Sequence, residues 1–155
     1  MANEEFIKEA LKEAKEAFKK DEVPIGAVII KDGKIIARAY NKRNKSKIAI
    51  NHAEILAIKK ACKKLKSWRL EGCDIYVSLE PCPMCAGAIL NARINNLYFG
   101  AYNKTTKTNI VSLIMNDDIL NHKTNVVGGI LENECSQILT NFFENKRNAQ
   151  KESLL

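Results

Sequence analysis

The strongest local signals for the fold lie in the segment Asp74-Ile75-Tyr76-Val77-Ser78-Leu79-Glu80-Pro81-Cys82-Pro83-Met84-Cys85. Residues 74–79 form a short apolar run, which predicts a buried strand that ends at Glu80-Pro81. A helix is predicted from Cys82 to Leu90, because a proline at the first helical position loses no hydrogen bond. The two cysteines then share one face of the helix start. Free backbone N–H groups and the helix dipole favour thiolates there, and the thiolate is the form that binds metal.

Three more helices are predicted from apolar residues that recur at a helical period. They cover residues 4–20, the segment from His52 to about Leu65, and residues 131–146. Residues 41–50 are polar and basic and show no period, which predicts a loop between the second strand and the second helix.

The other strands complete a sheet around the central one. Two β-branched runs joined by Asp32-Gly33 predict a hairpin of residues 26–30 and 34–39. Further strands are predicted at residues 96–100 and 124–127. A hairpin followed by alternating helices and strands predicts a three-layer α/β/α domain with a mixed five-stranded sheet. The length predicts a single domain over residues 1–155, with its core at about 4–147 and a basic C-terminal tail.

The composition favours a soluble protein of the cytoplasm. Hydrophobic residues make up 46% of the chain and charged residues 28%, which is ordinary for a globular domain. The five cysteines are an odd number without the spacing of a disulfide framework, which favours a reducing compartment. The sequence has no apolar run near the roughly 18 residues of a membrane span, and its N-terminus lacks the apolar core of a signal peptide. We therefore expect a cytoplasmic location and no membrane association.

The net charge of +7 favours a polyanionic partner such as nucleic acid. Basic residues cluster at residues 42–47, 104–107 and 146–151. The alternative is a lysine-rich chain whose lysines are solvated everywhere and contact no partner.

The segment His52-Ala53-Glu54, upstream of the two cysteines, completes the ligand set of a catalytic zinc site. Such sites hold zinc with three protein ligands and leave a fourth position for water, so His52, Cys82 and Cys85 are predicted to bind one Zn²⁺ per chain. Zinc-bound water loses a proton near neutral pH, which makes a hydroxide nucleophile available. Glu54 is close in sequence but free of the metal, and it is predicted to be the catalytic residue that passes protons.

Two other interpretations of the cysteine pair remain open. An isolated C-x-x-C also occurs as a redox pair or as half of a structural zinc site. A structural zinc normally has four protein ligands, and the sequence contains no second C-x-x-C and no H-x-x-x-H. A redox pair would leave the histidine and glutamate upstream unexplained. Both observations favour the catalytic site.

The pattern H-x-E followed by P-C-x-x-C is the signature of zinc-dependent nucleobase deaminases. Over residues 4–147 the chain resembles the bacterial tRNA-specific adenosine deaminases, which have the cytidine deaminase-like fold. The resemblance implies a homodimeric hydrolase that deaminates adenosine to inosine at the wobble position of a tRNA anticodon loop. Its most specific parts are the start Glu22-Val23-Pro24-Ile25-Gly26-Ala27 and the run Cys82-Pro83-Met84-Cys85-Ala86-Gly87. The matching segments are residues 21–28, 41, 52–54, 67–73, 76–89, 99–101, 121–122, 129–131 and 142–143.

The resemblance also implies substrate contacts. Asn41 would hold the target nucleoside, and the backbone of Ala53 would contact the edge of the base. His122, Phe142 and Phe143 would line the groove for the anticodon loop. The structural alternatives are an ordinary turn residue for Asn41 and a place in the core for the two phenylalanines.

The chain departs from the family pattern at two places. Asn103 stands where the family has an aspartate, in a segment, residues 102–111, that lacks the usual Gly-rich run. Ile50-Asn51 stand where the family has small or hydroxyl residues before His52. In the family, the aspartate contacts the sugar beside the target base. A carboxylate only accepts a hydrogen bond from a ribose 2′-hydroxyl, whereas an amide donates and accepts, so Asn103 predicts tolerance of single-stranded DNA.

Three functions remain to be separated. The first is the deaminase that acts on tRNA. The second is a deaminase of a free base or nucleoside, of the guanine or cytosine type, and the third is a zinc-stabilised nucleic-acid-binding module without turnover. The basic clusters argue against the second, because a free nucleoside requires no such surface, and the presence of Glu54 argues against the third.

Overall fold

The computed structural model describes residues 2–104, 110–117 and 120–154, and these residues form one mixed five-stranded sheet, as the sequence predicted. Its strand order is β2-β1-β3-β4-β5. The strand β1 runs antiparallel to its two neighbours, β2 and β3, and the strands β3, β4 and β5 are parallel to one another. The strands are β1 (Gly26–Lys31), β2 (Lys34–Tyr40), β3 (Cys73–Leu79), β4 (Asn96–Ala101) and β5 (Asn125–Val127).

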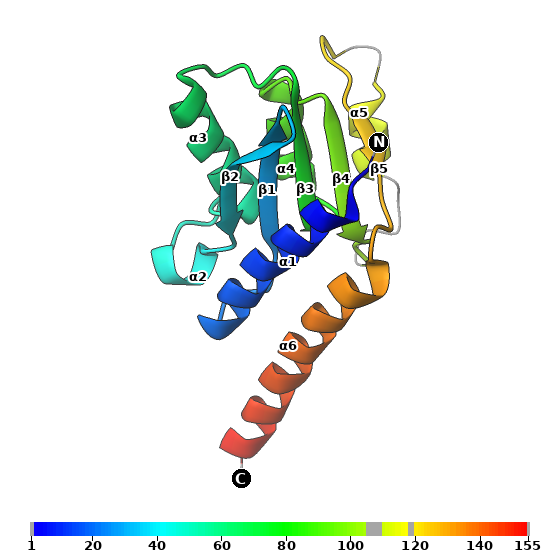
Figure 1. The fold of residues 1–155 in the computed structure, drawn as a ribbon. Helices are drawn as coiled ribbons and strands as arrows, with labels where there is room; N and C mark the ends of the chain where they lie inside the picture. The colour runs from blue at the N-terminus through cyan, green and yellow to red at the C-terminus, as the bar shows by residue number, and fades with distance from the viewer. Residues whose placement is uncertain (1, 105–109, 118–119, 155) are drawn as a thin grey trace.

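Helices cover both faces of the sheet and produce the predicted layers (Figure 1). They are α1 (Glu4–Lys19), α2 (Arg43–Ser46), α3 (Ala53–Leu65), α4 (Pro83–Asn91), α5 (Ile110–Met115) and α6 (Glu132–Ser153). Successive side chains of a strand point to opposite faces. Val28 and Ile30 of β1 therefore pack with residues of α1 and α6, while Ala27 and Ile29 pack with residues of α3 and α4.

The hairpin of β1 and β2 turns at Asp32-Gly33, where the sequence predicted it. The φ angles of the two residues are 50° and 74°. Positive φ at both positions is what a two-residue type I′ turn requires, and it matches the twist of the flanking strands. This turn leaves β1 between β2 and β3. The helices on the two faces of the sheet bury its side chains on both sides.

Three helices differ from the sequence prediction. The helix α2 lies in the segment predicted to be a loop, and α5 was not predicted at all. These helices have four and six residues, too few to show a periodic pattern. The predicted end of the last helix near Lys146 was wrong, since α6 continues to Ser153 and projects beyond the sheet (Figure 1). The projecting end of α6 does not pack on the core, so its sequence does not show the apolar period of a buried helix face.

Some predictions fall partly outside the described residues. Of the basic cluster at 104–107, only Lys104 is described, and the altered segment 102–111 lacks a description at 105–109. In the parts of the chain that are described, every helix falls short of the length and apolar character needed to cross a membrane.

One edge of the sheet gathers the candidate site residues. The parallel strands β3 and β4 both end at this edge, and β2 ends there too, because Tyr40 pairs with the start of the antiparallel β1. The segments that follow these strands carry Asn41, Cys82 and Asn103. The backbone N–H of Lys42 donates to the carbonyl of Asn51 at 3.0 Å, which returns the chain to the same edge just before α3.

Candidate metal centre and active site

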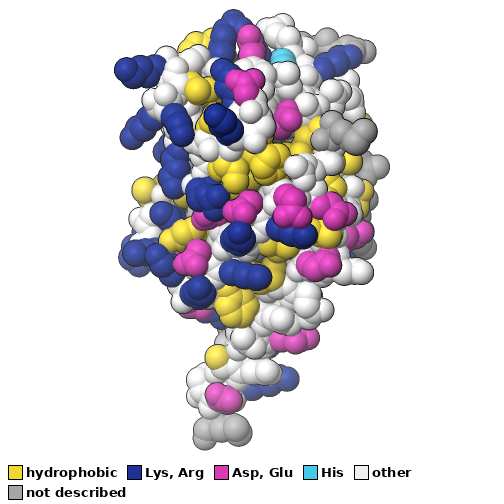
Figure 2. Space-filling model, viewed as in Figure 1, with side chains coloured by type: hydrophobic (Ala, Val, Ile, Leu, Met, Phe, Trp, Pro, Cys, Tyr) yellow, Lys and Arg dark blue, Asp and Glu magenta, His cyan; other side chains and the backbone are white. Residues whose placement is uncertain are grey.

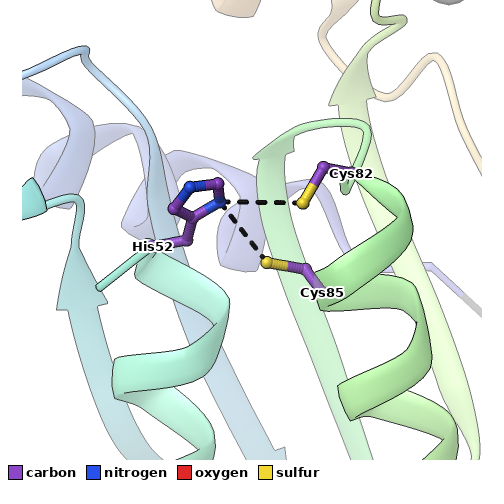
Figure 3. A group of neighbouring side chains, drawn as sticks. All are labelled: His52, Cys82 and Cys85. Carbon is purple, nitrogen blue, oxygen red and sulfur yellow. Dashed lines mark hydrogen bonds between the residues drawn. The ribbon is translucent and has the colours of Figure 1, made fainter. Parts of the chain in front are cut away.

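The three predicted ligands converge from the starts of two helices. His52 is the residue before α3, Cys82 is the residue before α4, and Cys85 lies in the first turn of α4. Figure 3 shows the imidazole and both sulfur atoms pointing into the space between these helix starts. The Nδ1 atom of His52 lies 3.7 Å from the Cys82 sulfur and 3.6 Å from the Cys85 sulfur. All three candidate ligand atoms lie within 4.8 Å of one another.

This spacing fits a tetrahedral zinc ion. Zinc–sulfur and zinc–nitrogen bonds of about 2.3 and 2.0 Å at tetrahedral angles place the two ligand atoms about 3.5 Å apart. The two nitrogen–sulfur distances, 3.7 and 3.6 Å, are close to that value. One imidazole and two thiolates are also ligand types that zinc prefers. The residues present therefore fit zinc both in chemistry and in geometry.

The two thiols differ in acidity because they share a hydrogen bond. That bond, with help from the backbone N–H groups of Met84 and Cys85, lowers the pKa of Cys82 to about 5. The same bond and burial raise the pKa of Cys85 above its usual value. The helix start thus favours one thiolate without metal, and a metal ion would have to displace the proton that remains on Cys85.

Glu54 lies buried beside the ligands with an unpaired oxygen. It is the second residue of α3 and is only 3% exposed. Its Oε1 atom has no hydrogen-bond partner among the described atoms. Burial raises the pKa of its carboxyl group. An unpaired buried polar atom costs free energy, so it marks a place where a ligand or water completes the site. A carboxyl group that protonates more readily than usual is suited to proton transfer near neutral pH.

Asn41 and Ala53 lie at the same edge of the sheet. The Asn41 side chain is buried, and its Oδ1 accepts a hydrogen bond from the backbone N–H of Arg43 at 3.3 Å. Its Nδ2 donates to the carbonyl of Val23 at 3.4 Å. Ala53, also buried, is the first residue of α3. Both bonds of Asn41 are long, so the amide retains capacity for a further partner.

A groove of about 450 Å³ lies beyond the end of β4 and brings Asn103 together with Phe143. The Phe143 ring is 45% exposed, and Arg147 lies one helical turn further along α6 in the same groove. The backbone N–H of Asn103 donates to the side chain of Glu80 at 3.0 Å, which holds this segment at the strand end. An exposed ring beside basic and amide groups is suited to binding nucleic acid by stacking and phosphate contacts.

Phe142 and His122 lie elsewhere. Phe142 is 5% exposed, and its ring packs against Phe18 of α1 with 5.7 Å between centroids. The Nε2 atom of His122 lies 2.8 Å from the carbonyl oxygen of Ile94, and the residue lines a different pocket that includes Pro83. In the structure, Phe143 therefore lines the same groove as Asn103, whereas Phe142 and His122 do not.

Two carboxylates support the site although sequence reasoning assigned them no role. Glu22 is 1% exposed and accepts hydrogen bonds from the backbone N–H groups of Asn44 and Lys45. Glu80 holds the backbone of Asn103. The available signal was a charged residue that flanks an apolar stretch: Glu22 precedes the residues that lead into β1, and Glu80 directly follows β3.

Comparisons with known proteins identify the family of this chain. The family model described as MafB19-like deaminase matches residues 1–147. The tRNA-specific adenosine deaminase of Bacillus subtilis (strain 168) is 47% identical over 150 residues, which cover 96% of this chain and 93% of that protein. A solved structure from studies of A-to-I editing by tRNA deaminases at the wobble position is 41% identical, with a TM-score of 0.82, and covers 88% of this chain and 100% of its own. The predicted cytidine deaminase-like fold is thereby confirmed.

A guanine deaminase also matches in part. The structure of the enzyme from Bacillus subtilis is 44% identical, with a TM-score of 0.62, over 66% of each chain. The zinc signature is shared across deaminases with different substrates.

Proposed function

Since this chain belongs to the MafB19-like deaminase family, and within it to the tRNA-specific adenosine deaminases, we propose that it converts adenosine to inosine at the wobble position of a tRNA anticodon loop. The observation that carries this proposal is the unpaired buried oxygen of Glu54 beside the convergent side chains of His52, Cys82 and Cys85. A structural zinc site or a redox pair gives no reason for a buried carboxylate with one unpaired oxygen there.

His52, Cys82 and Cys85 would hold one zinc ion per chain. Zinc bound by three protein ligands supplies a hydroxide nucleophile near neutral pH. Glu54 takes one proton from the attacking water and gives it to a nitrogen of the adenine ring. It then takes the proton of the new hydroxyl group on C6 and gives it to the amino group, which leaves C6 as ammonia while C6 keeps the oxygen as a carbonyl. One water is consumed and one ammonia is released, and the carboxyl group returns to its starting state.

The placement of Asn41, Ala53 and Phe143 supports the proposed substrate contacts. The backbone N–H at the first position of a helix has no partner within the helix, so the N–H of Ala53 is available to the edge of the base. The Asn41 amide lies at the same sheet edge and would hold the sugar of the target nucleoside. Phe143 would stack on a neighbouring base of the loop.

A basic surface next to the site supports an RNA substrate. Figure 2 shows Lys and Arg side chains along the edge of the molecule that carries β2 and α2. The sequence of residues 42–47, which includes α2, contains four Lys and Arg residues, and Arg147 and Lys104 line the groove of Phe143. Phosphate contacts by such groups strengthen binding of any nucleic acid and weaken as salt rises.

The substrate can be tested directly by measuring ammonia release from tRNA, single-stranded DNA, adenosine, cytidine and guanine in separate incubations. We expect the highest kcat/KM for tRNA. The alternative supported by the partial match to guanine deaminase predicts turnover of guanine instead. Comparable rates on adenosine and on tRNA would contradict the proposal, because the basic surface would then contribute nothing.

A cytoplasmic location is also part of the proposal. It is supported by the five cysteines, which lie within the described residues and are all free thiols, as expected in a reducing compartment.

Asn103→Asp is expected to increase the preference for RNA over DNA. Asn103 lies in the groove with a neutral amide, and a carboxylate in its place accepts a hydrogen bond from a ribose 2′-hydroxyl. A hydrogen bond to a charged group contributes about 1.5–3 kcal/mol, so the ratio of kcat/KM for tRNA over single-stranded DNA should rise by about tenfold or more. Rates on matched RNA and DNA stem-loops measure this ratio.

Asn121→Asp serves as the control for added negative charge, because Asn121 lines the pocket of His122 rather than the groove. It should lower rates on both substrates alike or leave them unchanged. An unchanged ratio in Asn103→Asp would refute the proposed sugar contact.

We also propose a homodimer that is formed through the outer face of α3 and α4. A shallow groove on this face is lined by Ile55, Ile58 and Trp68, and Trp68 is 58% exposed. Exposed apolar patches of this kind mark interaction surfaces.

The wild-type chain should sediment as a dimer. Trp68→Ala should raise the dissociation constant of the dimer by roughly tenfold or more, as expected for a central aromatic contact. Leu113→Ala, which removes a 67% exposed side chain from α5, should not, and a concentration-independent wild-type monomer would exclude the dimer.

A further inference from the structure

Glu22 belongs to the motif that begins β1, yet the catalytic proposal assigns it no role. It lies in the short connection between α1 and β1 and is 1% exposed. One carboxylate oxygen accepts the backbone N–H of Asn44 at 2.9 Å, and the other accepts that of Lys45 at 2.7 Å. These are charge-assisted bonds, which are stronger than bonds between neutral groups. Glu22 therefore connects two segments that are distant in the sequence.

The two N–H groups belong to the first turn of α2. The first N–H groups of any helix lack partners within the helix and are usually capped by the side chain of the preceding residue. That residue is Lys42 here, which has no acceptor, and its side chain makes no capping bond among the described atoms. Glu22 supplies the missing cap from outside, and Asn41 accepts the remaining N–H, that of Arg43. The negative charge also complements the positive end of the helix dipole.

The capped segment is part of a closed loop that ends at the metal site. We call residues 41–51 the capped loop. The N–H of Lys42 donates to the carbonyl of Asn51 at 3.0 Å, and the side chain of Asn51 donates to Ser46 Oγ at 2.9 Å. His52 follows directly and its N–H donates to the carbonyl of Ile50 at 2.8 Å. These bonds tie the backbone of α2, which carries Arg43 and Lys45, to the segment directly before His52.

The residue next to Glu22 joins the capped loop to the groove. The carbonyl of Val23 accepts the Asn41 side chain at 3.4 Å, and Val23 itself lines the groove with Asn103 and Phe143. The connection of Glu22 and Val23 thus lies between the basic loop on one side and the aromatic groove on the other.

We propose that Glu22 is a positioning residue that caps α2 and thereby holds the basic side chains of the capped loop against the RNA substrate. The inference rests on the proposed function, because it assigns these side chains to an RNA. By charge alone, Glu22 opposes the binding of a polyanion. As a helix cap, it promotes the binding of RNA. Repulsion by charge and support by capping therefore predict opposite changes in KM when the charge of Glu22 is removed.

Glu22→Gln tests the proposal in the zinc-loaded full-length chain. The substitution keeps the shape of the side chain but replaces one acceptor with a donor, so one of the two N–H groups loses its partner. We expect KM for tRNA to rise roughly five- to tenfold, as for the loss of a helix cap, while kcat at saturating tRNA and zinc content stay unchanged. Backbone amides of residues 43–46 should also exchange hydrogen faster, while those of β3 keep their protection.

Glu16→Gln is the matched control, because it removes the same charge from an exposed position of α1 whose carboxylate bonds only Lys19 among the interactions seen. It should leave KM unchanged or lower it. A lowered KM in Glu22→Gln would overturn the proposal in favour of charge, and a fall in kcat together with zinc loss would overturn it in favour of a structural role. Unchanged hydrogen exchange of the backbone amides of residues 43–46 would refute the capping role of Glu22, whatever the substrate is. Failure of wild type to act on tRNA would instead refute the proposed function while the exchange result still decides the cap.

Discussion

Glu54→Gln is expected to abolish deamination while the chain retains its zinc. The amide occupies the same buried space but cannot accept the proton of water or return it to the base. General acid–base catalysis contributes roughly a hundred- to ten-thousand-fold, so kcat should fall by that factor. Zinc should remain at wild-type stoichiometry, because the three candidate ligand atoms belong to His52, Cys82 and Cys85. Inosine formation in tRNA and metal analysis of the same preparation measure both quantities.

The stability of this variant distinguishes a catalytic from a structural carboxylate. Glu54 Oε1 makes no hydrogen bond among the described atoms, so its replacement breaks no structural bond at that oxygen. The melting temperature should therefore stay near that of the wild type. Glu71→Gln, at an exposed position paired with Arg69, should retain full activity and serves as the control. Substantial turnover by Glu54→Gln would remove Glu54 from the mechanism, and zinc loss would make it part of the metal site.

Cys85→Ala is expected to lose both zinc and activity and to unfold at a lower temperature. Only His52 and Cys82 of the candidate group would remain, and two ligands do not hold zinc in a catalytic site. Metal binding is coupled to folding because the assembled site is absent from the unfolded chain. The ligands come from the starts of α3 and α4, so loss of the metal removes a connection between these helices. Metal analysis and thermal unfolding with and without a chelator measure both effects.

The matched control is Cys73→Ala, since Cys73 is equally buried and is a free thiol outside the candidate ligand group. Both variants leave a cavity of similar size, so both should lose some stability. Only Cys85→Ala should become insensitive to the chelator. Full zinc occupancy in Cys85→Ala would contradict the ligand assignment.

Much of the fold could be predicted because it is encoded by neighbouring residues. The strand over residues 74–79 and the helix that follows it were predicted from an apolar run and from Pro83, and both are present. The turn at Asp32-Gly33 was predicted from its residue types, and both residues have positive φ. The helix α2 could not be predicted in this way, because its cap is Glu22, a residue outside the local sequence.

The two phenylalanines of α6 show where local pattern stops. Adjacent residues of a helix point in different directions, and which of them is buried depends on what packs against the helix. Phe18 of α1 covers Phe142, so Phe142 is buried and Phe143 is left exposed in the groove. The sequence predicted a functional role for both and contained no information on the partner helix.

The residue types alone identified the candidate side chains for the chemistry, because zinc ligation and proton transfer require particular residue types that occur in one recognisable pattern. How these side chains come together depends on the packing of distant segments. In a regular helix, His52 and Glu54 would point apart, but His52 has φ −75° and ψ 155°, an extended backbone just before α3. The layers then bring His52 within 3.6 Å of a cysteine 33 residues away. Distances of that kind result from how the helices pack on the sheet, and no local sequence pattern specifies packing between distant segments.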